Sequence, residues 1–184
     1  VGGNIELRRF APGLRSHGSI ALRDAVEHRM PVSEAELRSL LADPATDEPT
    51  RRMVEIDLAL YAGRASFLPD ELIDGPPRSV ELAGRRLSLG VERGVSGGDV
   101  WVLDHASGVL AVGDFVTLPV PFFDTACAEL WRDALARLGE LPYTRVVPGH
   151  GPVMEAEGLE IDAVDVNLPA LIKGSFSTTT AIKN

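Results

Sequence analysis

The sequence contains one cysteine, Cys127, and only four histidines among its 184 residues. A single cysteine excludes an intramolecular disulfide framework and any zinc site that needs several cysteines. Because imidazole is a common metal ligand, the four histidines also limit the metal chemistry that the chain can perform alone. They are His17, His28, His105 and His150.

Basic residues and long apolar runs are also scarce. The chain has 18 Lys and Arg against 27 Asp and Glu, which gives a formal net charge of -9. This acidic balance argues against a protein that binds nucleic acid. No apolar run approaches the ~18 residues of a membrane span, so we expect no membrane partner. With 45% hydrophobic and 24% charged residues, the chain is predicted to be soluble and globular, in the cytoplasm or the periplasm.

The chain begins with Val1-Gly2-Gly3-Asn4, which resembles neither a signal peptide nor a transit peptide. We therefore expect either that an upstream segment is removed or that the sequence is a piece of a longer protein. The length of 184 residues fits one domain of ordinary size with a sizeable core.

The first 65 residues favour helices, because their apolar residues recur at helical spacing. Three helices are expected, over about residues 20–30, 33–43 and 47–62. Pro31 is expected to end the first, since proline interrupts the hydrogen bonds of a helix. Ser33 and Glu36 fit a capping box for the second helix. Asp47 marks the start of the third helix, and Gly63 marks its end.

From residue 78 the pattern changes to the alternation of apolar and polar residues that is typical of strands. The expected elements are a hairpin over 80–89, strands over 99–104 and 109–112, a helix over about 126–138 and a buried strand over 144–147. Pro148 is expected to break the last strand sharply.

Two strand ends carry side chains that are suited to chemistry. Asp114 follows an apolar strand and Gly113, so a carboxylate lies at the C-terminal edge of a strand. In open α/β architectures this edge faces the ligand crevice. His150 follows the second apolar strand and lies between Gly149 and Gly151, which let a ligand approach the backbone.

A carboxylate and an imidazole at neighbouring strand ends can form half of a zinc site, because zinc accepts both ligand types. Each residue also has a simpler interpretation. Asp114 can be a turn residue that bonds its own backbone, and His150 can be a surface-loop histidine. The residues by themselves leave both interpretations open.

The motifs VLAVGD (109–114) and RVVPGHGPV (145–153), with a helix between them, resemble the C-terminal half of the metallo-β-lactamase superfamily. The resemblance covers roughly residues 78–153. In that family the strand-end Gly-Asp supplies an aspartate that bridges two metal ions, and the late Gly-His-Gly supplies a further histidine. The resemblance implies that Asp114 and His150 are zinc ligands, and that Asp114 is also catalytic because it orients a metal-activated water.

The sequence departs from the family in two places. The signature His-x-His-x-Asp-His is absent, although Val1-Gly2-Gly3 resembles the residues that commonly follow it. Val95 stands where the family has its middle histidine, and valine cannot bind a metal. The resemblance therefore implies two zinc ions in a complete protein but low or no zinc occupancy in this chain alone. His17, His28 and His105 are assigned structural roles.

The resemblance implies an α/β fold, a metallo-β-lactamase-like αββα sandwich that is incomplete at its N-terminus. We expect this domain to cover residues 1–154, with an early helical part over 1–65 and a strand-rich part over 78–153. Residues 155–184 are expected to form a C-terminal extension that is partly disordered. Because the first strands would be missing, we also expect self-association through an exposed sheet edge.

Two functions from different classes follow. The first is a metal-dependent hydrolase that uses metal-activated water on a small-molecule substrate of unknown class. The second is a non-catalytic, degenerate or truncated family member that acts as a binding or structural module, because one Asp and one His do not complete a metal shell.

Overall fold

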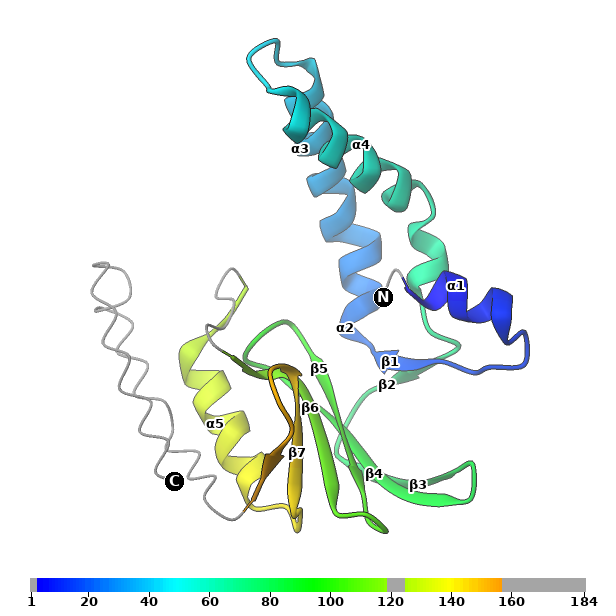
Figure 1. Ribbon diagram of the computed structural model, residues 1–184, viewed down its shortest axis with the longest axis vertical. Helices are drawn as coiled ribbons and strands as arrows, with labels where there is room; N and C mark the ends of the chain where they lie inside the picture. Colours follow the sequence, from blue (N-terminus) through cyan, green and yellow to red (C-terminus); the bar gives the residue numbers. More distant parts are fainter. Residues whose placement is uncertain (1–2, 119–124, 157–184) are drawn as a thin grey trace. The chain divides into compact units, whose positions relative to one another are not determined.

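The computed structural model describes residues 3–118 and 125–156, which form a mixed α/β chain (Figure 1). The chain divides into two compact units, Val1–Ile73, called the N-terminal unit below, and Asp74–Asn184, called the C-terminal unit. The boundary falls between the predicted helical part and the predicted strand-rich part. Most of the predicted C-terminal extension, from residue 157 onward, lies outside the described residues. No helix among the described residues is long and apolar enough to span a membrane.

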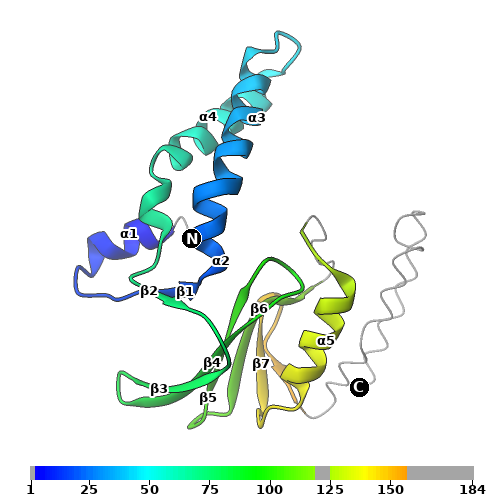
Figure 2. The ribbon, with the colours of Figure 1, turned by 180° about the vertical axis from the view of Figure 1, so that it is seen from behind.

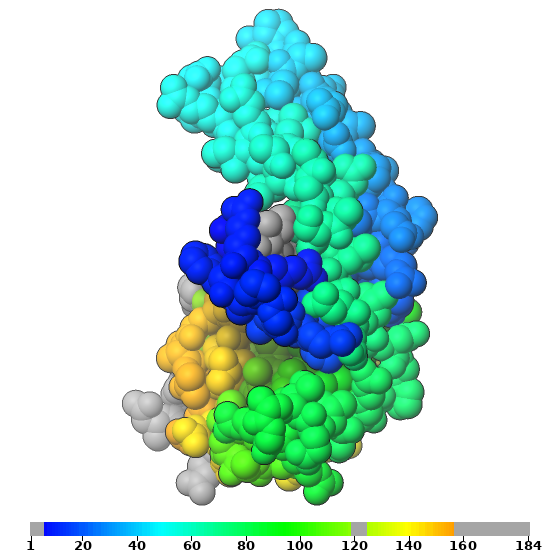
Figure 3. All heavy atoms as spheres, turned by 90° about the vertical axis from the view of Figure 1, so that its right-hand side faces the viewer, coloured from blue at the N-terminus to red at the C-terminus, as the bar shows by residue number. Residues whose placement is uncertain are grey.

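The N-terminal unit is mainly helical. Its elements are α1 (Gly3–Phe10), β1 (His17–Ser19), α2 (Ala21–Asp24), the π-helical turn η1 (Ala25–Arg29), α3 (Met30–Ala42), α4 (Glu48–Ala62), the 3-10 turn η2 (Arg64–Phe67) and β2 (Glu71–Ile73). The short strands β1 and β2 pair in parallel, with His17 opposite Glu71. Figure 3 shows α1, in dark blue, at the surface.

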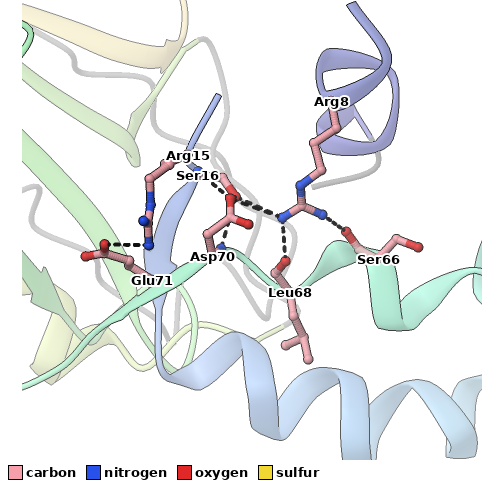
Figure 4. A network of polar contacts seen from close by, with 7 residues as sticks. All are labelled: Arg8, Arg15, Ser16, Ser66, Leu68, Asp70 and Glu71. Carbon is pink, nitrogen blue, oxygen red and sulfur yellow. Dashed lines mark hydrogen bonds and ion pairs between the residues drawn. The ribbon is translucent and has the colours of Figure 1, made fainter. Parts of the chain in front are cut away.

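A polar network ties α1 to the segment that leads into β2 (Figure 4). The Arg8 guanidinium donates hydrogen bonds to the carbonyl oxygens of Ser66, at 2.8 Å, and Leu68, at 2.9 Å. The Asp70 carboxylate accepts hydrogen bonds from the backbone N–H of Ser16 at 2.7 Å and from its hydroxyl at 2.8 Å. These bonds lower the pKa of Asp70 to about 2, and the nearby charge of Arg8 adds to the shift.

The predicted end of a helix at Pro31 is wrong. Helical structure runs without a break from α2 through η1 into α3, and Pro31 lies in the first turn of α3. The backbone N–H of Met30 bonds to the carbonyl of Ala25, five residues earlier, which is the bond of a π-helical turn. This wider turn lies just before Pro31, where the proline ring would otherwise clash with an earlier carbonyl. The predicted capping box is wrong too, because Ser33 lies inside α3.

The third predicted helix is confirmed as α4. Asp47 caps it, and its carboxylate accepts a hydrogen bond from the backbone N–H of Thr50 at 2.8 Å. Gly63 follows its last residue. The Arg51 side chain also donates hydrogen bonds to the carbonyl oxygens of Leu41, at 2.8 Å, and Thr46, at 3.0 Å. A side chain of α4 therefore satisfies an open carbonyl group at the end of α3 and another in the loop between α3 and α4.

The C-terminal unit contains a six-stranded sheet and one helix. Its elements are β3 (Arg78–Leu82), β4 (Arg85–Glu92), β5 (Asp99–Asp104), β6 (Val109–Thr117), α5 (Ala128–Gly139), β7 (Arg145–His150) and β8 (Met154–Glu155). The strands lie in the order β3-β4-β5-β6-β7-β8. Neighbouring strands are antiparallel except β6 and β7, which are parallel and connected through α5. The predicted hairpin, the two central strands and the helix are confirmed.

Helix α5 covers one face of the sheet (Figures 1 and 2), and the core lies between them. The core side chains come from alternate positions of β5 and β6 and from one face of α5. They include Trp101, Leu103, Leu110, Val112, Trp131, Ala134, Leu135 and Leu138, and none is more than 8% exposed. Gly90 on β4 leaves space for an indole ring, because a Cβ there would lie 2.8 Å from the ring of Trp101.

The predicted break of the last strand at Pro148 is also wrong. Strand β7 continues through Pro148 to His150, and Pro148 pairs with Gly113 of β6. On its other side β7 pairs with β8 only at Arg145 and Val146. Proline lacks the N–H of a ladder, but it is tolerated here because no strand of the described residues pairs with that edge.

Candidate functional site

The two predicted site residues lie side by side at one end of the sheet. Asp114 lies on β6 and His150 ends β7, and these parallel neighbours pair with Thr117 opposite His150. The Nε2 atom of His150 is 3.6 Å from the Oδ1 atom of Asp114. Their side chains are 58% and 50% exposed, so both groups reach solvent. The structure therefore brings together two donors that are 36 positions apart in the sequence; their role as metal ligands stays a prediction.

The backbone of β6 turns at Gly113, directly before Asp114. Gly113 has a φ of 56°, which is in the left-handed region that favours glycine. The register with β7 shifts on either side of this residue. An irregularity of this kind re-aims the side chains that follow it. The glycine of the Gly-Asp motif therefore has a structural function, because it changes the direction of β6 directly before Asp114.

Gly149 allows the two strand ends to approach. A Cβ on Gly149 would overlap the Asp114 carboxylate and would lie 2.8 Å from the backbone nitrogen of Asp114. The Leu118 N–H also donates a hydrogen bond to the carbonyl of His150 at 3.0 Å, which ties the end of β6 to the end of β7. The glycine before His150 is thus required by close packing against Asp114.

Asp99 is a third ionisable residue at this end of the sheet, and the sequence analysis missed it. Strands β5 and β6 are antiparallel with Val102 opposite Ala111, so the start of β5 lies beside the later part of β6. Burial raises the pKa of the Asp99 carboxyl, hydrogen bonds from Ser96 oppose this effect, and the negative charge of Asp114 adds to it. The sequence feature that could have indicated Asp99 is Ser96-Gly97-Gly98-Asp99, a short loop that the Asp99 side chain closes by bonding to Ser96.

Asp99 holds the loop that contains Val95. Its carboxylate accepts hydrogen bonds from the backbone N–H of Ser96 at 2.9 Å and from the Ser96 hydroxyl at 2.8 Å. Val95 is 8% exposed and belongs to the core. Its carbonyl oxygen accepts a hydrogen bond from the Thr125 hydroxyl at 2.8 Å. Val95 is therefore a packing residue of this core.

The described residues do not complete a zinc site. A catalytic zinc ion takes three protein ligands, and a structural one takes four. Asp114 and His150 provide two donors, and no group of three or more His, Cys, Asp or Glu in the described part of the chain is placed to hold a metal ion. Any further ligand would have to come from other residues.

The remaining histidines have partners elsewhere. His17 lies 3.7 Å from Glu71, and His28 lies 3.1 Å from Asp24 in an exposed pair one helical turn away. The Nε2 atom of His105 lies 2.7 Å from the Ser88 hydroxyl. None of these three contacts involves Asp114 or His150.

A surface hollow of about 440 Å³ lies at the other end of the sheet. Its lining includes Asp104 at the end of β5, Val109 at the start of β6 and Arg145 at the start of β7. Arg85 and Asp104 form an ion pair of 2.8 Å there. Because β6 and β7 run in parallel, this hollow is separated from Asp114 and His150 by the length of the strands, and it does not belong to the candidate site.

Comparison with known proteins gives matches among solved structures. No family model matches the sequence, and no curated protein matches it. A metallo-β-lactamase from Pontibacter korlensis is 22% identical, with a TM-score of 0.45, and the match covers 56% of this chain and 51% of that one. A metallo-β-lactamase from Hirschia baltica is 19% identical, with a TM-score of 0.43 and coverage of 56% and 50%.

An archaeal metallo-β-lactamase superfamily protein from Sulfolobus tokodaii is 16% identical, with a TM-score of 0.37, and the match covers 66% of this chain and 51% of that one. The chain spans about half the length of these solved structures. Over part of its length, this mixed α/β chain is similar to structures of the metallo-β-lactamase superfamily, the family that its sequence motifs resemble.

Proposed function

We propose that this chain is part of a metal-dependent hydrolase of the metallo-β-lactamase superfamily that acts on a small molecule. Asp114 and His150 would be two of the zinc ligands. The observation that carries the proposal is the 3.6 Å approach of these two side chains from separate strands. A carboxylate and an imidazole are ligands that zinc accepts, and both are exposed to solvent, as an open catalytic position requires.

The local backbone supports a functional role for this pair. Gly113 has the positive φ that turns β6 before Asp114, and Gly149 leaves the space that the Asp114 carboxylate occupies. Neither glycine serves to bury the side chain that follows it, because Asp114 and His150 are both exposed. The local structure therefore holds a carboxylate and an imidazole together in solvent, which supports the proposed role of Asp114 and His150 as metal ligands.

Zinc binding by the chain tests the proposal. Because two ligands do not complete a shell, we expect isothermal titration calorimetry to show weak zinc binding, whose affinity falls about tenfold or more in Asp114→Asn and in His150→Ala, since each removes a ligand. His28→Ala is the matched control, because His28 is exposed and pairs with Asp24. Equal zinc affinity in all four proteins would contradict the assignment of Asp114 and His150.

A second candidate function is a non-catalytic binding or structural module. It is favoured by the burial of Val95 and by the lack of a third metal ligand in the described part of the chain. The discriminating measurement is the zinc content of the purified chain after saturation and desalting. Retention of more than about 0.1 zinc per chain would favour the hydrolase, because two ligands alone do not retain the ion and further residues of the chain must then bind it. A lower content would mean that this chain by itself is a module without metal.

A further inference from the structure

The outward face of α4 carries a stripe of apolar side chains. Met53, Ile56 and Leu60 are 65%, 62% and 46% exposed. Residues spaced by three and four positions lie on one face of a helix, so these three side chains form a continuous row, called the α4 stripe below. Val54, the buried residue of α4 at 4% exposure, lies on the opposite face. The stripe is therefore separate from the side of α4 that packs within the unit.

The spacing of the α4 stripe is that of a helix–helix seam. Met53, Ile56 and Leu60 correspond to positions a, d and a of a heptad, which are the positions that meet in a coiled coil. On the same assignment Arg52 takes position g and Asp57 takes position e, so charges of opposite sign flank the stripe. A scattered set of exposed apolar residues would carry no such order.

We propose that the α4 stripe is a docking surface for a second copy of this chain, with the two α4 helices packed in parallel. In a parallel pair, position g of one helix lies beside position e of the following heptad of the other helix. Arg52 of each copy would then meet Asp57 of the second copy, so two ion pairs flank the apolar seam. An antiparallel pair would bring position g beside position g and position e beside position e, so Arg52 and Asp57 would lie on opposite sides of the seam.

The contacts within one chain leave these charges available. Arg52 pairs with Glu48 at 3.0 Å, but their side chains are 74% and 66% exposed, and exposed pairs of this kind stabilise a helix only slightly. Asp57 forms no ion pair with any described residue. A seam of one and a half heptads belongs to the small interfaces, below about 1,200 Å², so we expect a weak, concentration-dependent dimer with a Kd on the order of micromolar.

Sedimentation velocity over about 5 to 500 µM of the full chain tests the proposal, since this range spans the expected Kd. We expect the sedimentation coefficient to rise with concentration in the wild type and to stay at the monomer value in Ile56→Glu. Val32→Glu is the matched control, because Val32 is 60% exposed on α3, outside the stripe. Asp57→Arg should weaken the dimer, and Arg52→Asp combined with Asp57→Arg should restore it.

Disulfide trapping tests the orientation. In a Cys127→Ser background, Met53→Cys places one thiol at the same seam position of each copy, and oxidised glutathione should link them into a covalent dimer. Glu55→Cys on the side of α4 should not give this product. In an antiparallel pair, position a faces position d of the other helix, so residue 53 would not meet its own counterpart and Met53→Cys would cross-link poorly.

Four results would overturn the proposal. The first is a wild type that stays monomeric over the whole range, and the second is an equal effect of Ile56→Glu and Val32→Glu on the sedimentation coefficient. The third is a dimer that persists in Ile56→Glu. The fourth is a lower melting temperature of Ile56→Glu than of the wild type, at concentrations where the wild type is monomeric. The third result would locate the contact elsewhere, such as the sheet edge at β3. The fourth would show that the stripe is covered within one chain.

Discussion

Among the residues that the structure describes, the N-terminal unit buries four apolar side chains, namely Val26, Val54, Phe67 and Ile73, whereas the C-terminal unit buries twelve. The exposed large apolar residues in the same part of the chain show the opposite distribution, because eight of the ten lie in the N-terminal unit. A sheet covered by a helix can bury alternate residues of every strand, but a pair of helices buries one narrow stripe. The two units therefore differ in what holds them together.

Polar contacts take a larger share in the N-terminal unit. Arg8 and Asp70 connect α1 to the segment before β2, and Arg51 closes the end of α3. Hydrogen bonds of this kind fix geometry but give a small net stabilisation, because the unfolded chain bonds to water. We therefore expect the C-terminal unit to respond most to changes of volume, and the N-terminal unit to loss of specific bonds.

The largest effect is expected from Leu103→Ala in the core of the C-terminal unit. Leu103 is 1% exposed, so removing its side chain leaves a cavity and should cost about 2–5 kcal/mol of unfolding free energy. Both tryptophans of the sequence, Trp101 and Trp131, belong to this core, so tryptophan fluorescence during urea unfolding reports on it. Leu60→Ala on α4, followed by far-UV circular dichroism, should change the unfolding free energy of the N-terminal unit by less than about 0.5 kcal/mol. Equal effects would contradict the difference between the units.

Gly149→Ala should have the next largest effect. The new Cβ would overlap the Asp114 carboxylate, and displacement of the strand ends should cost about 1–3 kcal/mol. Zinc affinity should fall with it. Gly139→Ala is the control, because a Cβ at Gly139 meets no atom within 4 Å and its φ is not positive. The comparison uses urea unfolding for both variants, and a neutral Gly149→Ala would show that the strand ends adjust without cost.

Arg51→Ala should destabilise the N-terminal unit by about 1–2 kcal/mol, because it removes hydrogen bonds to carbonyl groups at the end of α3 and in the loop that follows it. Its neighbour offers a matched control. Arg52→Ala removes one exposed ion pair with Glu48 and should cost about 0–0.5 kcal/mol. Far-UV circular dichroism during urea unfolding measures both, since most helices lie in this unit. An equal loss in both variants would mean that the Arg51 bonds give no net stabilisation.

The smallest effect is a difference in pH dependence. The pKa of Asp70 falls from 3.8 to about 2 on folding, so its contribution is present above about pH 4 and is lost as the pH falls toward 2. Asp70→Asn should therefore flatten the acid side of the N-terminal unit's stability curve.

The pKa of Asp99 is raised instead, chiefly by burial, so its contribution is present at low pH and is lost as the pH rises. Asp99→Asn should stabilise the C-terminal unit at neutral pH, as measured by tryptophan fluorescence; a loss of stability there would contradict the sign.

Elements with local signals were predictable from the sequence. The hairpin, strands β5 and β6, and helices α4 and α5 follow from residue periodicity and from caps such as Asp47, which depend on neighbours along the chain. The two prolines misled the prediction for a common reason. Pro31 follows a π-helical turn, so its ring avoids the expected clash with an earlier carbonyl group. Pro148 lies where one side of β7 has no pairing strand among the described residues, so the missing N–H costs no hydrogen bond of the sheet.

The candidate site was predictable only in part. Asp114 and His150 were identified by the glycines next to them, which mark the special backbone at the strand ends. Asp99 was missed because its relation to Asp114 depends on the antiparallel register of β5 and β6, not on distance along the chain. The parallel pairing of β1 and β2, about fifty residues apart, was missed for the same reason.

The mixed α/β character, the acidic balance and the two donors at strand ends follow from the sequence, because periodicity, composition and motif are local properties. The 3.6 Å approach of His150 to Asp114, the burial of Val95 and the exposure of the α4 stripe follow from the tertiary structure. These facts depend on which strands become neighbours and which helix faces find a partner. Such choices are made by packing across the whole chain, where a single residue's preference is outweighed by the surface that its neighbours bury.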